Sequence, residues 1–481
     1  MPRGNSDPQT VQRLREAFPD IADDARSAPD REPAADGPAL IRTARAFFVV
    51  AAATSAVAAP FLYRQDSHYN FLVIIAATAG LLGFGLSPWI AERAERHGAD
   101  SIAAATILER WSTLAVFAAF LALYGATMFP PTPYNEQLRQ AIAFIHGHVS
   151  INAPQSFLEH AQVGPYSYAL HAPLPAILMM PLAAIWGMKT DQTEFSVVIG
   201  AIDIALAWVL IGRLGRGINV RVWLTLFFGT GTVIWYETLL GTTWAMPMTF
   251  AVLFTLLALI ELFGEARPLW IGIFAATACL ARYDMALAVP SYAAIAYWRG
   301  RRIEELLWIV PPFAVAGALF VGFNEVRYHS FFDQGMMIIA PRYGHSHAFS
   351  LAYLPGNLYT LFFMAPGLND RFPYIHPEFG GQALTLTSPA FVLALRPSFK
   401  RLEVAALGIA SVLVAVPSLL FFANGYAQFG TRLYITIFPP LLAMMALGMG
   451  RRADQIARIL IVASIVLVSF GIWHIRMYGF G

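Results

Sequence analysis

Long apolar stretches alternate with short polar ones over most of the chain, and two longer polar regions interrupt this pattern. Several apolar stretches approach the ~20 residues that a helix needs to span the hydrocarbon core of a bilayer. The pattern therefore predicts an all-α, polytopic helical membrane protein with about 13 transmembrane helices. The predicted spans are residues 44–63, 69–91, 112–129, 194–212, 221–239, 245–264, 269–282, 285–298, 305–323, 383–396, 403–423, 432–449 and 456–475.

The orientation of these spans depends on residues 174–187, which are apolar but short and interrupted by prolines. If this segment crossed the membrane, the basic loop 213–221 would lie outside, whereas short basic loops normally stay in the cytoplasm. We therefore interpret 174–187 as a juxtamembrane, half-inserted helix. Every short basic loop then lies inside, and residues 130–193 and 324–382 form two long external loops.

The N-terminal part of the chain has a different pattern. Residues 1–43 are charged and rich in proline and alanine, which predicts a disordered cytoplasmic tail rather than a secretory signal. Residues 44–111 are expected to form an extra transmembrane hairpin followed by an internal loop. Residues 112–481 form the main predicted transmembrane domain.

The composition supports a membrane protein, because 57% of the residues are hydrophobic and only 13% are charged. Soluble domains carry roughly 25% charged residues. The formal net charge of +2 argues against nucleic-acid binding. The single cysteine, Cys279, excludes an intrachain disulfide and a cysteine-based metal site.

The candidate chemistry lies in the polar regions on the predicted external side. Transfer of a sugar from a lipid phosphate needs a carboxylate to orient or deprotonate the acceptor hydroxyl. It also needs cations to hold the departing phosphate, and a guanidinium can donate two parallel hydrogen bonds to it. The candidate residues are Glu136, Arg139, His171, Glu237, Arg282, Arg327, Arg342, Asp370 and Arg432.

Three motifs carry a resemblance to a known family. They are YNEQLRQAIAFIHGHVSI at 134–151, YSYALHAPLPAILMMPLAAIWG at 166–187 and FAATACLARYDMALAVP at 274–290. In order and spacing they resemble the GT-C glycosyltransferases, which include protein O-mannosyltransferases and the aminoarabinose transferases that act on lipid A. Four further stretches look like a bacterial subgroup of GT-C-like proteins. They are FNEVRYHSFFDQGM, FSLAYLPGNLYTLFFMAPG, GQALTLTSPAFVLAL and YAQFGTRLYITIFPPLLAMM.

The resemblance implies a GT-C-like fold, with a large first external loop that carries juxtamembrane helices. It implies that Glu136 is the catalytic carboxylate, although many relatives have Asp at or just before this point. It also implies that Arg282 faces the lipid phosphate and that His171 occupies the histidine position before the proline-rich motif. Relatives often carry a second Asp after the third core span. Here that function is either lost or moved to Glu237.

Several candidates keep a structural alternative. Arg139 follows Glu136 on one helical face, so an ion pair is as consistent as a substrate contact. Arg282 and Asp284 lie in an apolar stretch, where charges are usually functional or paired. The His-x-His pairs at 146/148 and 345/347 lack an acidic third ligand at a fixed spacing, so no metal site is assigned. The family leaves room for a weakly bound divalent cation.

The favoured function is transfer of a sugar from a polyprenyl-phosphate donor to an envelope glycan, lipid or protein. The reaction would occur on the external face of a bacterial inner membrane. No cofactor is expected, because the donor already holds the linkage energy and the chain has no Gly-rich phosphate-binding motif. One alternative is a transporter or flippase for a lipid-linked sugar, for which Asp203 is the clearest charge within a span. The other is a non-catalytic family member that binds a lipid-linked glycan.

Overall fold

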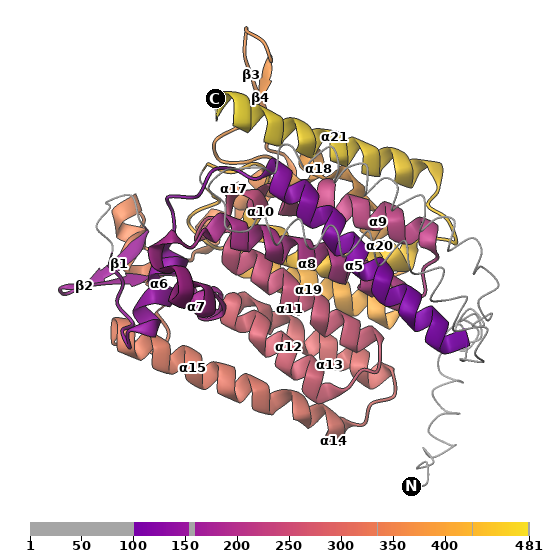
Figure 1. Ribbon diagram of the computed structural model, residues 1–481, viewed down its shortest axis with the longest axis horizontal. Helices are drawn as coiled ribbons and strands as arrows, with labels where there is room; N and C mark the ends of the chain where they lie inside the picture. The colour runs from indigo at the N-terminus through magenta and orange to yellow at the C-terminus, as the bar shows by residue number, and fades with distance from the viewer. Residues whose placement is uncertain (1–100, 153–158, 334, 426, 480–481) are drawn as a thin grey trace. The chain divides into compact units, whose positions relative to one another are not determined.

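The computed structural model describes residues 101–481, apart from 153–158, 334, 426 and 480–481. The predicted tail 1–43 and the predicted hairpin 44–91 lie outside the described residues. In the described part the chain is predominantly helical and its strands are short (Figure 1). This confirms the helical class of the fold.

The α-helices follow one another along the whole described chain. They are α5 (Ser101–Thr127), α6 (Glu136–Ile145), α7 (Leu174–Trp186), α8 (Gln192–Arg213), α9 (Ile218–Thr230), α10 (Ile234–Leu240), α11 (Met246–Phe263), α12 (Pro268–Ala281), α13 (Val289–Trp298), α14 (Ile303–Leu306), α15 (Val310–Tyr328), α16 (Met336–Ile339), α17 (Leu354–Phe362), α18 (Leu384–Thr387), α19 (Leu402–Leu419), α20 (Phe438–Gly448) and α21 (Gln455–Tyr478).

Short 3-10 helices and two small antiparallel hairpins complete the described fold. The 3-10 helices are η1 (Gly187–Lys189), η2 (Tyr283–Ala288), η3 (Leu307–Ile309), η4 (Ala340–Tyr343), η5 (Leu351–Tyr353), η6 (Pro389–Leu395) and η7 (Arg432–Ile437). The hairpins pair β1 (His160–Val163) with β2 (Tyr166–Ala169), and β3 (Gly367–Leu368) with β4 (Ile375–His376).

Five helical segments of the described chain are long and apolar enough to cross a membrane. They are Gln192–Arg213, Met246–Phe263, Ile303–Tyr328, Leu402–Leu419 and Gln455–Tyr478. A sixth span results if α9 and α10 are taken together. These helices support the prediction of a membrane protein with several helical spans.

Within the described residues, two predicted spans are interrupted by non-helical residues. The predicted span 221–239 is divided between α9 and α10, which are bent by 46° at their break. Gly231 lies at that break and caps α9. The predicted span 383–396 consists of the short helix α18 and the 3-10 helix η6, which begins at Pro389. Proline removes a backbone donor and so disfavours a continuous α-helix here.

Other boundaries also differ from the prediction. Helix α5 begins at Ser101, inside the segment 92–111 that was expected to be an internal loop. Helix α15 continues to Tyr328, so the first part of the expected loop 324–382 is helical. The predicted short helix at 174–187 is confirmed as α7, with a proline in its first turn and Pro181 inside it. Its half-inserted position stays a prediction.

Capping side chains define the starts of two of the long spans. The Asp191 carboxylate accepts hydrogen bonds from the backbone N–H groups of Thr193 and Glu194 at the start of α8, at 2.8 and 3.3 Å. Asp454 accepts from the N–H of Ala457 at the start of α21, at 2.8 Å. Such caps satisfy backbone donors that have no partner within the helix.

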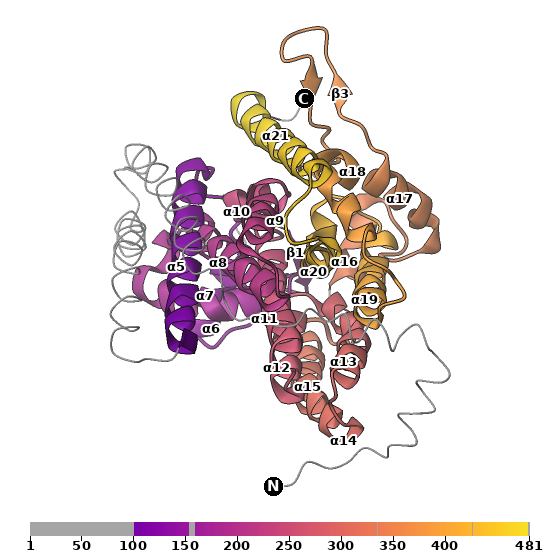
Figure 2. The same cartoon turned by 90° about the vertical axis from the view of Figure 1, so that its right-hand side faces the viewer.

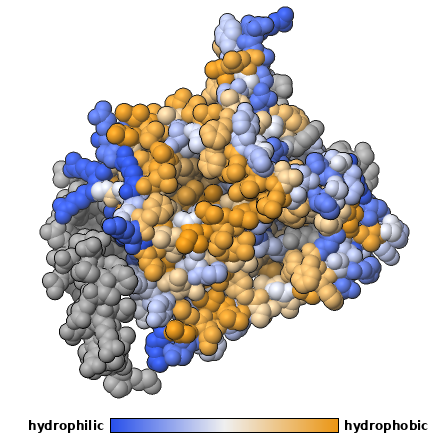
Figure 3. All heavy atoms as spheres, turned by 180° about the vertical axis from the view of Figure 1, so that it is seen from behind, coloured by the Kyte–Doolittle hydropathy of each residue, from blue (hydrophilic) through white to orange (hydrophobic). Residues whose placement is uncertain are grey.

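Helix α11 lies inside the bundle and α15 lies at its edge (Figures 1 and 2). The most apolar window of α11 is 83% buried by protein, against 11% for the span that contains α15. Apolar side chains form a broad band across the face shown in Figure 3, with hydrophilic residues gathered at its two sides. An apolar band between polar ends is the surface expected of a protein embedded in lipid.

Candidate functional site

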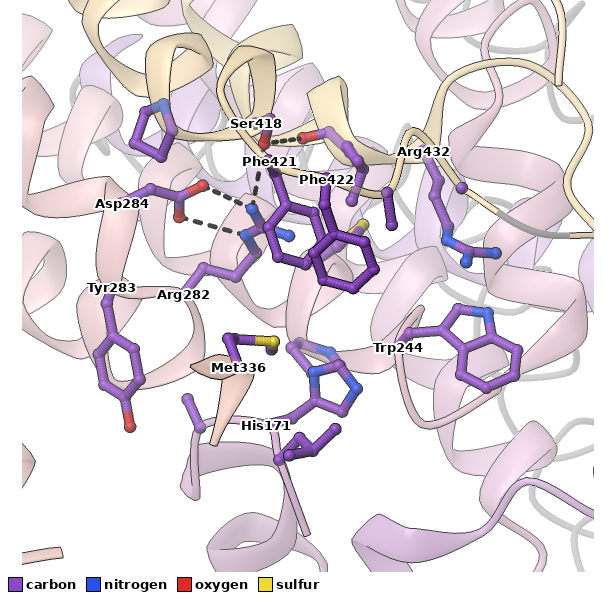
Figure 4. Close-up of a pocket in the computed structure, with 18 of the residues that line it drawn as sticks. His171, Trp244, Arg282, Tyr283, Asp284, Met336, Ser418, Phe421, Phe422 and Arg432 are labelled. Carbon is purple, nitrogen blue, oxygen red and sulfur yellow. Dashed lines mark hydrogen bonds and ion pairs between the residues drawn. The ribbon is translucent and has the colours of Figure 1, made fainter. Parts of the chain in front are cut away.

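A cavity of about 940 Å³ lies where the loops that follow α5 and α15 meet the turns between the central helices. Six segments of the chain supply its walls. They are Tyr134 before α6, the region from Glu159 to Ala172, the start of α11, the α12–η2 turn, the region from Met336 to Phe349, and the segment from Pro417 to Leu433. Figure 4 shows the side chains that point into this space.

Arg282 stands on one side of the cavity and is paired with an acid. Its guanidinium donates to both carboxylate oxygens of Asp284, at 3.2 and 2.6 Å, and a third contact of 3.5 Å reaches the Ser418 hydroxyl. The turn that carries both residues begins where α12 ends, with Arg282 in an extended conformation. Of the two alternatives for Arg282, the pairing with Asp284 is present, and a contact with phosphate stays a prediction.

Arg432 lies on the other side, beyond the rings of Phe421 and Phe422 (Figure 4). It is only 7% exposed, and its guanidinium carbon lies 5.1 Å from the centroid of the Trp244 ring. Electrostatic attraction links it to Glu237 and Glu159. A buried arginine that is attracted by two acids is favourable only while these partners remain in place.

Glu136 lies one layer behind the cavity wall, at the first position of α6. Its side chain is fully buried, and its Oε1 accepts a hydrogen bond of 2.7 Å from the Glu159 backbone N–H. No described residue donates a hydrogen bond to its Oε2. Burial raises the pKa of the Glu136 carboxyl from 4.5 to about 7, which is the range in which a carboxylate accepts protons at neutral pH.

Helix α6 is held in this position by Gln192 at the start of α8. The Gln192 side chain donates to the carbonyls of Tyr134 and Gly241, at 3.2 and 2.8 Å, and accepts from the Leu138 N–H at 3.1 Å. The Tyr134 carbonyl also accepts from the Thr243 N–H at 3.1 Å. These bonds fasten the start of α6 to the α10–α11 turn.

Glu159 lines the cavity, as does Asp284, and the sequence did not single Glu159 out. Burial raises the pKa of its carboxyl, and the Arg432 charge opposes that shift. It belongs to no motif, so nothing in the local sequence distinguishes it from other glutamates in loops. Its backbone N–H donates to Glu136 from the position just before β1, and this contact is set by the tertiary structure.

His171 points into the cavity from the loop before α7 (Figure 4). Burial lowers the pKa of His171 to about 3, and the positive charges of Arg282, Arg432 and Arg327 add to that effect. Its Nε2 has no hydrogen-bond partner among the described residues. At neutral pH the ring is therefore uncharged and can donate or accept one hydrogen bond.

Apolar and aromatic side chains form much of the remaining wall. They come from α11, η2, α16, the loop before η5, the end of α19 with the segment after it, and η7, and they include Met248, Leu287, Met336, Ile339, Phe349, Pro417, Phe421, Phe422 and Leu433. Charged groups at opposite sides of an apolar space suit a molecule with an ionic head and a hydrocarbon part.

Besides Glu136, five sequence candidates lie outside the cavity lining, and four of them are Arg139, Arg342, Asp370 and Glu237. Arg139 donates to Asn135 Oδ1 and to the Asn152 carbonyl. Arg342 is exposed and donates to the His160 carbonyl at 3.0 Å. Asp370 is exposed on the turn of the β3–β4 hairpin. The fourth, Glu237, is buried on α10 and acts on the site through its attraction to Arg432.

Arg327 also lies outside the cavity lining, and its guanidinium contacts other protein groups instead of the cavity. It is fully buried on α15 and donates to the Ala169 carbonyl at 2.6 Å and to Asn324 Oδ1 at 2.9 Å. Its guanidinium stacks over Phe323 at 3.8 Å. Arg327 therefore fastens β2 to α15.

Within the described residues, no group of three or more His, Cys, Asp or Glu side chains is arranged to hold a metal ion. Near the cavity, His345 contacts the aromatic residues Tyr353 and Phe422.

Comparison with protein-family models, with curated proteins and with solved structures finds no match for this chain. The fold and the geometry of the cavity are therefore the basis of the functional argument.

Proposed function

We propose that this protein is a membrane glycosyltransferase of the GT-C type, with about 13 spans. It would transfer a sugar from a polyprenyl-phosphate donor to an external glycan, lipid or protein. The observation that carries the proposal is the cavity, which combines two arginines, an apolar wall and an adjacent pair of carboxyls.

In this reaction the acceptor hydroxyl attacks the anomeric carbon of the sugar as the bond from that carbon to the phosphate oxygen breaks. The hydroxyl proton passes to a carboxylate, and the polyprenyl phosphate leaves with the bonding electrons. Arg282 and Arg432 stabilise the negative charge on that phosphate. The apolar wall receives the first part of the polyprenyl chain.

We assign the proton-accepting role to Glu136, because its pKa of about 7 suits a base at neutral pH. Since Glu136 lies behind the wall, the proton of the acceptor hydroxyl would reach it through the Glu159 carboxylate, which lines the cavity. Glu159 would orient the acceptor hydroxyl at the wall. The uncharged ring of His171 would hydrogen-bond a sugar hydroxyl or the phosphate without adding charge.

The test is sugar transfer by the purified protein in liposomes, with a panel of radiolabelled polyprenyl-phosphate sugars and membrane extracts as acceptors. We expect Glu136→Gln to lower the transfer rate by about 10²–10⁴-fold. The matched control is Glu265→Gln, because the Glu265 side chain is 70% exposed between α11 and α12. Equal rates for Glu136→Gln and the wild type, with a large loss in Glu159→Gln, would assign the base to Glu159 instead.

Binding of the radiolabelled donor is measured on the same samples. Donor binding without transfer by the wild type, for every donor and acceptor tried, would support a non-catalytic binding protein.

One observation favours the alternative of a transporter or flippase. Asp203 is fully buried on α8, and neither of its carboxylate oxygens is hydrogen-bonded by a described residue. Ionisable residues within a span often mark transport pathways. Movement of a fluorescent lipid-linked sugar across liposomes that is lost in Asp203→Asn, with no sugar transfer, would support this alternative.

A further inference from the structure

The β3–β4 hairpin exposes apolar side chains that no described residue covers. Leu368 is 80% exposed, Phe372 65%, Tyr374 58% and Ile375 44%. Only two residue pairs join the strands, so the turn extends beyond the paired part. Contiguous exposed apolar residues commonly mark a surface that contacts a membrane or a partner.

Helix α21 indicates the depth of this hairpin relative to a membrane. The Phe372 ring lies 6.4 Å from the Trp473 ring, and Trp473 lies in the last two turns of α21. Because a helix rises 1.5 Å per residue, Trp473 is about 8 Å from the end of this span at Tyr478. Tryptophan and tyrosine gather at the membrane–water interface. The hairpin therefore stands at the level of that interface.

The hairpin also continues the lipid-facing surface of α21. Val462 and Val466 are exposed along the helix, and Trp473 and Met477 are exposed near its end. In Figures 1 and 2 the hairpin stands beside the end of α21 and is steeply inclined to the helix axis. Since α21 is a candidate span, this inclination directs the hairpin along the membrane surface rather than away from it.

The tip of the hairpin differs from its sides. Asn369, Asp370 and Arg371 are exposed there, and the tip is hydrophilic in Figure 3. Apolar sides beside a charged tip match the boundary between acyl chains and headgroups. This favours lipid over a protein partner as the occupant.

We propose that the β3–β4 hairpin is an interfacial anchor, inserted among the headgroups and upper acyl chains of the leaflet at the C-terminal end of α21. Its base is tied to the cavity. The Gln428 side chain donates to the Gly380 carbonyl at 2.9 Å, and the loop that carries Gln428 leads from Gly425 to Arg432, which both line the cavity. The anchor thus holds one cavity wall at a fixed depth in the leaflet.

The experiment measures the depth of nitroxide labels in liposomes of phosphatidylcholine and phosphatidylglycerol. Cys279 is buried, and Cys279→Ala provides a background without thiols. Labels are placed by Leu368→Cys and Tyr374→Cys. The lipid reference is Val315→Cys on α15, where Val315 is 61% exposed, and the water reference is Arg452→Cys, in the exposed loop before α21.

Accessibility to oxygen and to a water-soluble nickel chelate gives the depth of each label by power saturation. We expect the oxygen-to-nickel ratio at Leu368 and Tyr374 to be several-fold higher than at Arg452 and below that at Val315. Ratios equal to that at Arg452 for both labels would overturn the proposal, and would leave a protein partner as the occupant. The measurement does not depend on sugar transfer, so its outcome is independent of the proposed function.

Discussion

The two segments predicted to be long external loops have similar numbers of ionisable residues in the sequence, but they fold differently. The first, 130–193, becomes a packed cap in which Glu136 is fully buried and His171 faces the cavity. The second, 324–382, leaves Arg342 and Asp370 exposed. Its contribution to the cavity is mainly apolar and aromatic. Burial next to a cavity, rather than the number of charged residues, separates candidates for chemistry from solvated side chains.

The largest expected effect is on the free energy of unfolding. It compares the loss of a buried charge of the site with the loss of an exposed charge of the second loop. Arg432→Gln leaves Glu237 and Glu159 without their cationic neighbour, and we expect it to lower the free energy of unfolding by about 3–5 kcal/mol. Arg342→Gln is the matched control and should change it by less than about 0.5 kcal/mol. Thermal unfolding in detergent measures both, and equal values for the two variants would contradict this account of Arg432.

The second prediction concerns Glu136 in the first loop and the pH dependence of the free energy of unfolding that it causes. Its folded pKa of about 7 lies above the unfolded value of 4.5, so the folded state binds more protons between these values. The free energy of unfolding should therefore fall as pH rises from about 4.5 to about 7, by roughly 3 kcal/mol in total. Glu136→Gln should remove this part of the pH dependence. An unchanged profile in that variant would show that Glu136 ionises as freely as in water.

His171 should produce a change of opposite sign and at least comparable size. Its folded pKa of about 3 lies below the unfolded value of 6.5, so the unfolded state binds more protons between these values. Stability should then be lost as pH falls from about 6.5 towards 3, and His171→Gln should reduce that loss. The double variant Glu136→Gln/His171→Gln separates the two contributions, because the remaining slope belongs to other groups.

The smallest expected effect is at the hairpin. Asp370→Asn should change the free energy of unfolding by no more than about 0.5 kcal/mol, as is typical of surface substitutions. The sugar-transfer rate should also stay the same, because Asp370 is exposed and outside the cavity lining. A large loss of transfer in this variant would place the acceptor at the hairpin and would remove the contrast between the two loops.

Much of the helical framework was predictable from the sequence. The cores of α8, α11, α19 and α21 coincide with predicted spans, because a helix must be apolar over most of its length to lie in lipid. Errors occurred where local chemistry overrides hydropathy. The bend between α9 and α10 lies at Gly231, and the 3-10 helix η6 begins at Pro389. Single residues thus interrupt segments that are otherwise apolar.

The sequence by itself determined that the protein is helical and apolar enough for a membrane, the positions of several spans, and the residue types available for chemistry. It left open whether Arg282 pairs with Asp284, although two residues so close in the chain can meet through a local turn, as they do here. Only the tertiary structure decided that the Glu159 backbone contacts Glu136, that buried Arg432 is attracted by two acids, and that Arg327 holds β2. These contacts join segments far apart in the sequence. They depend on how the loops pack, which no local pattern of hydrophobic and polar residues encodes.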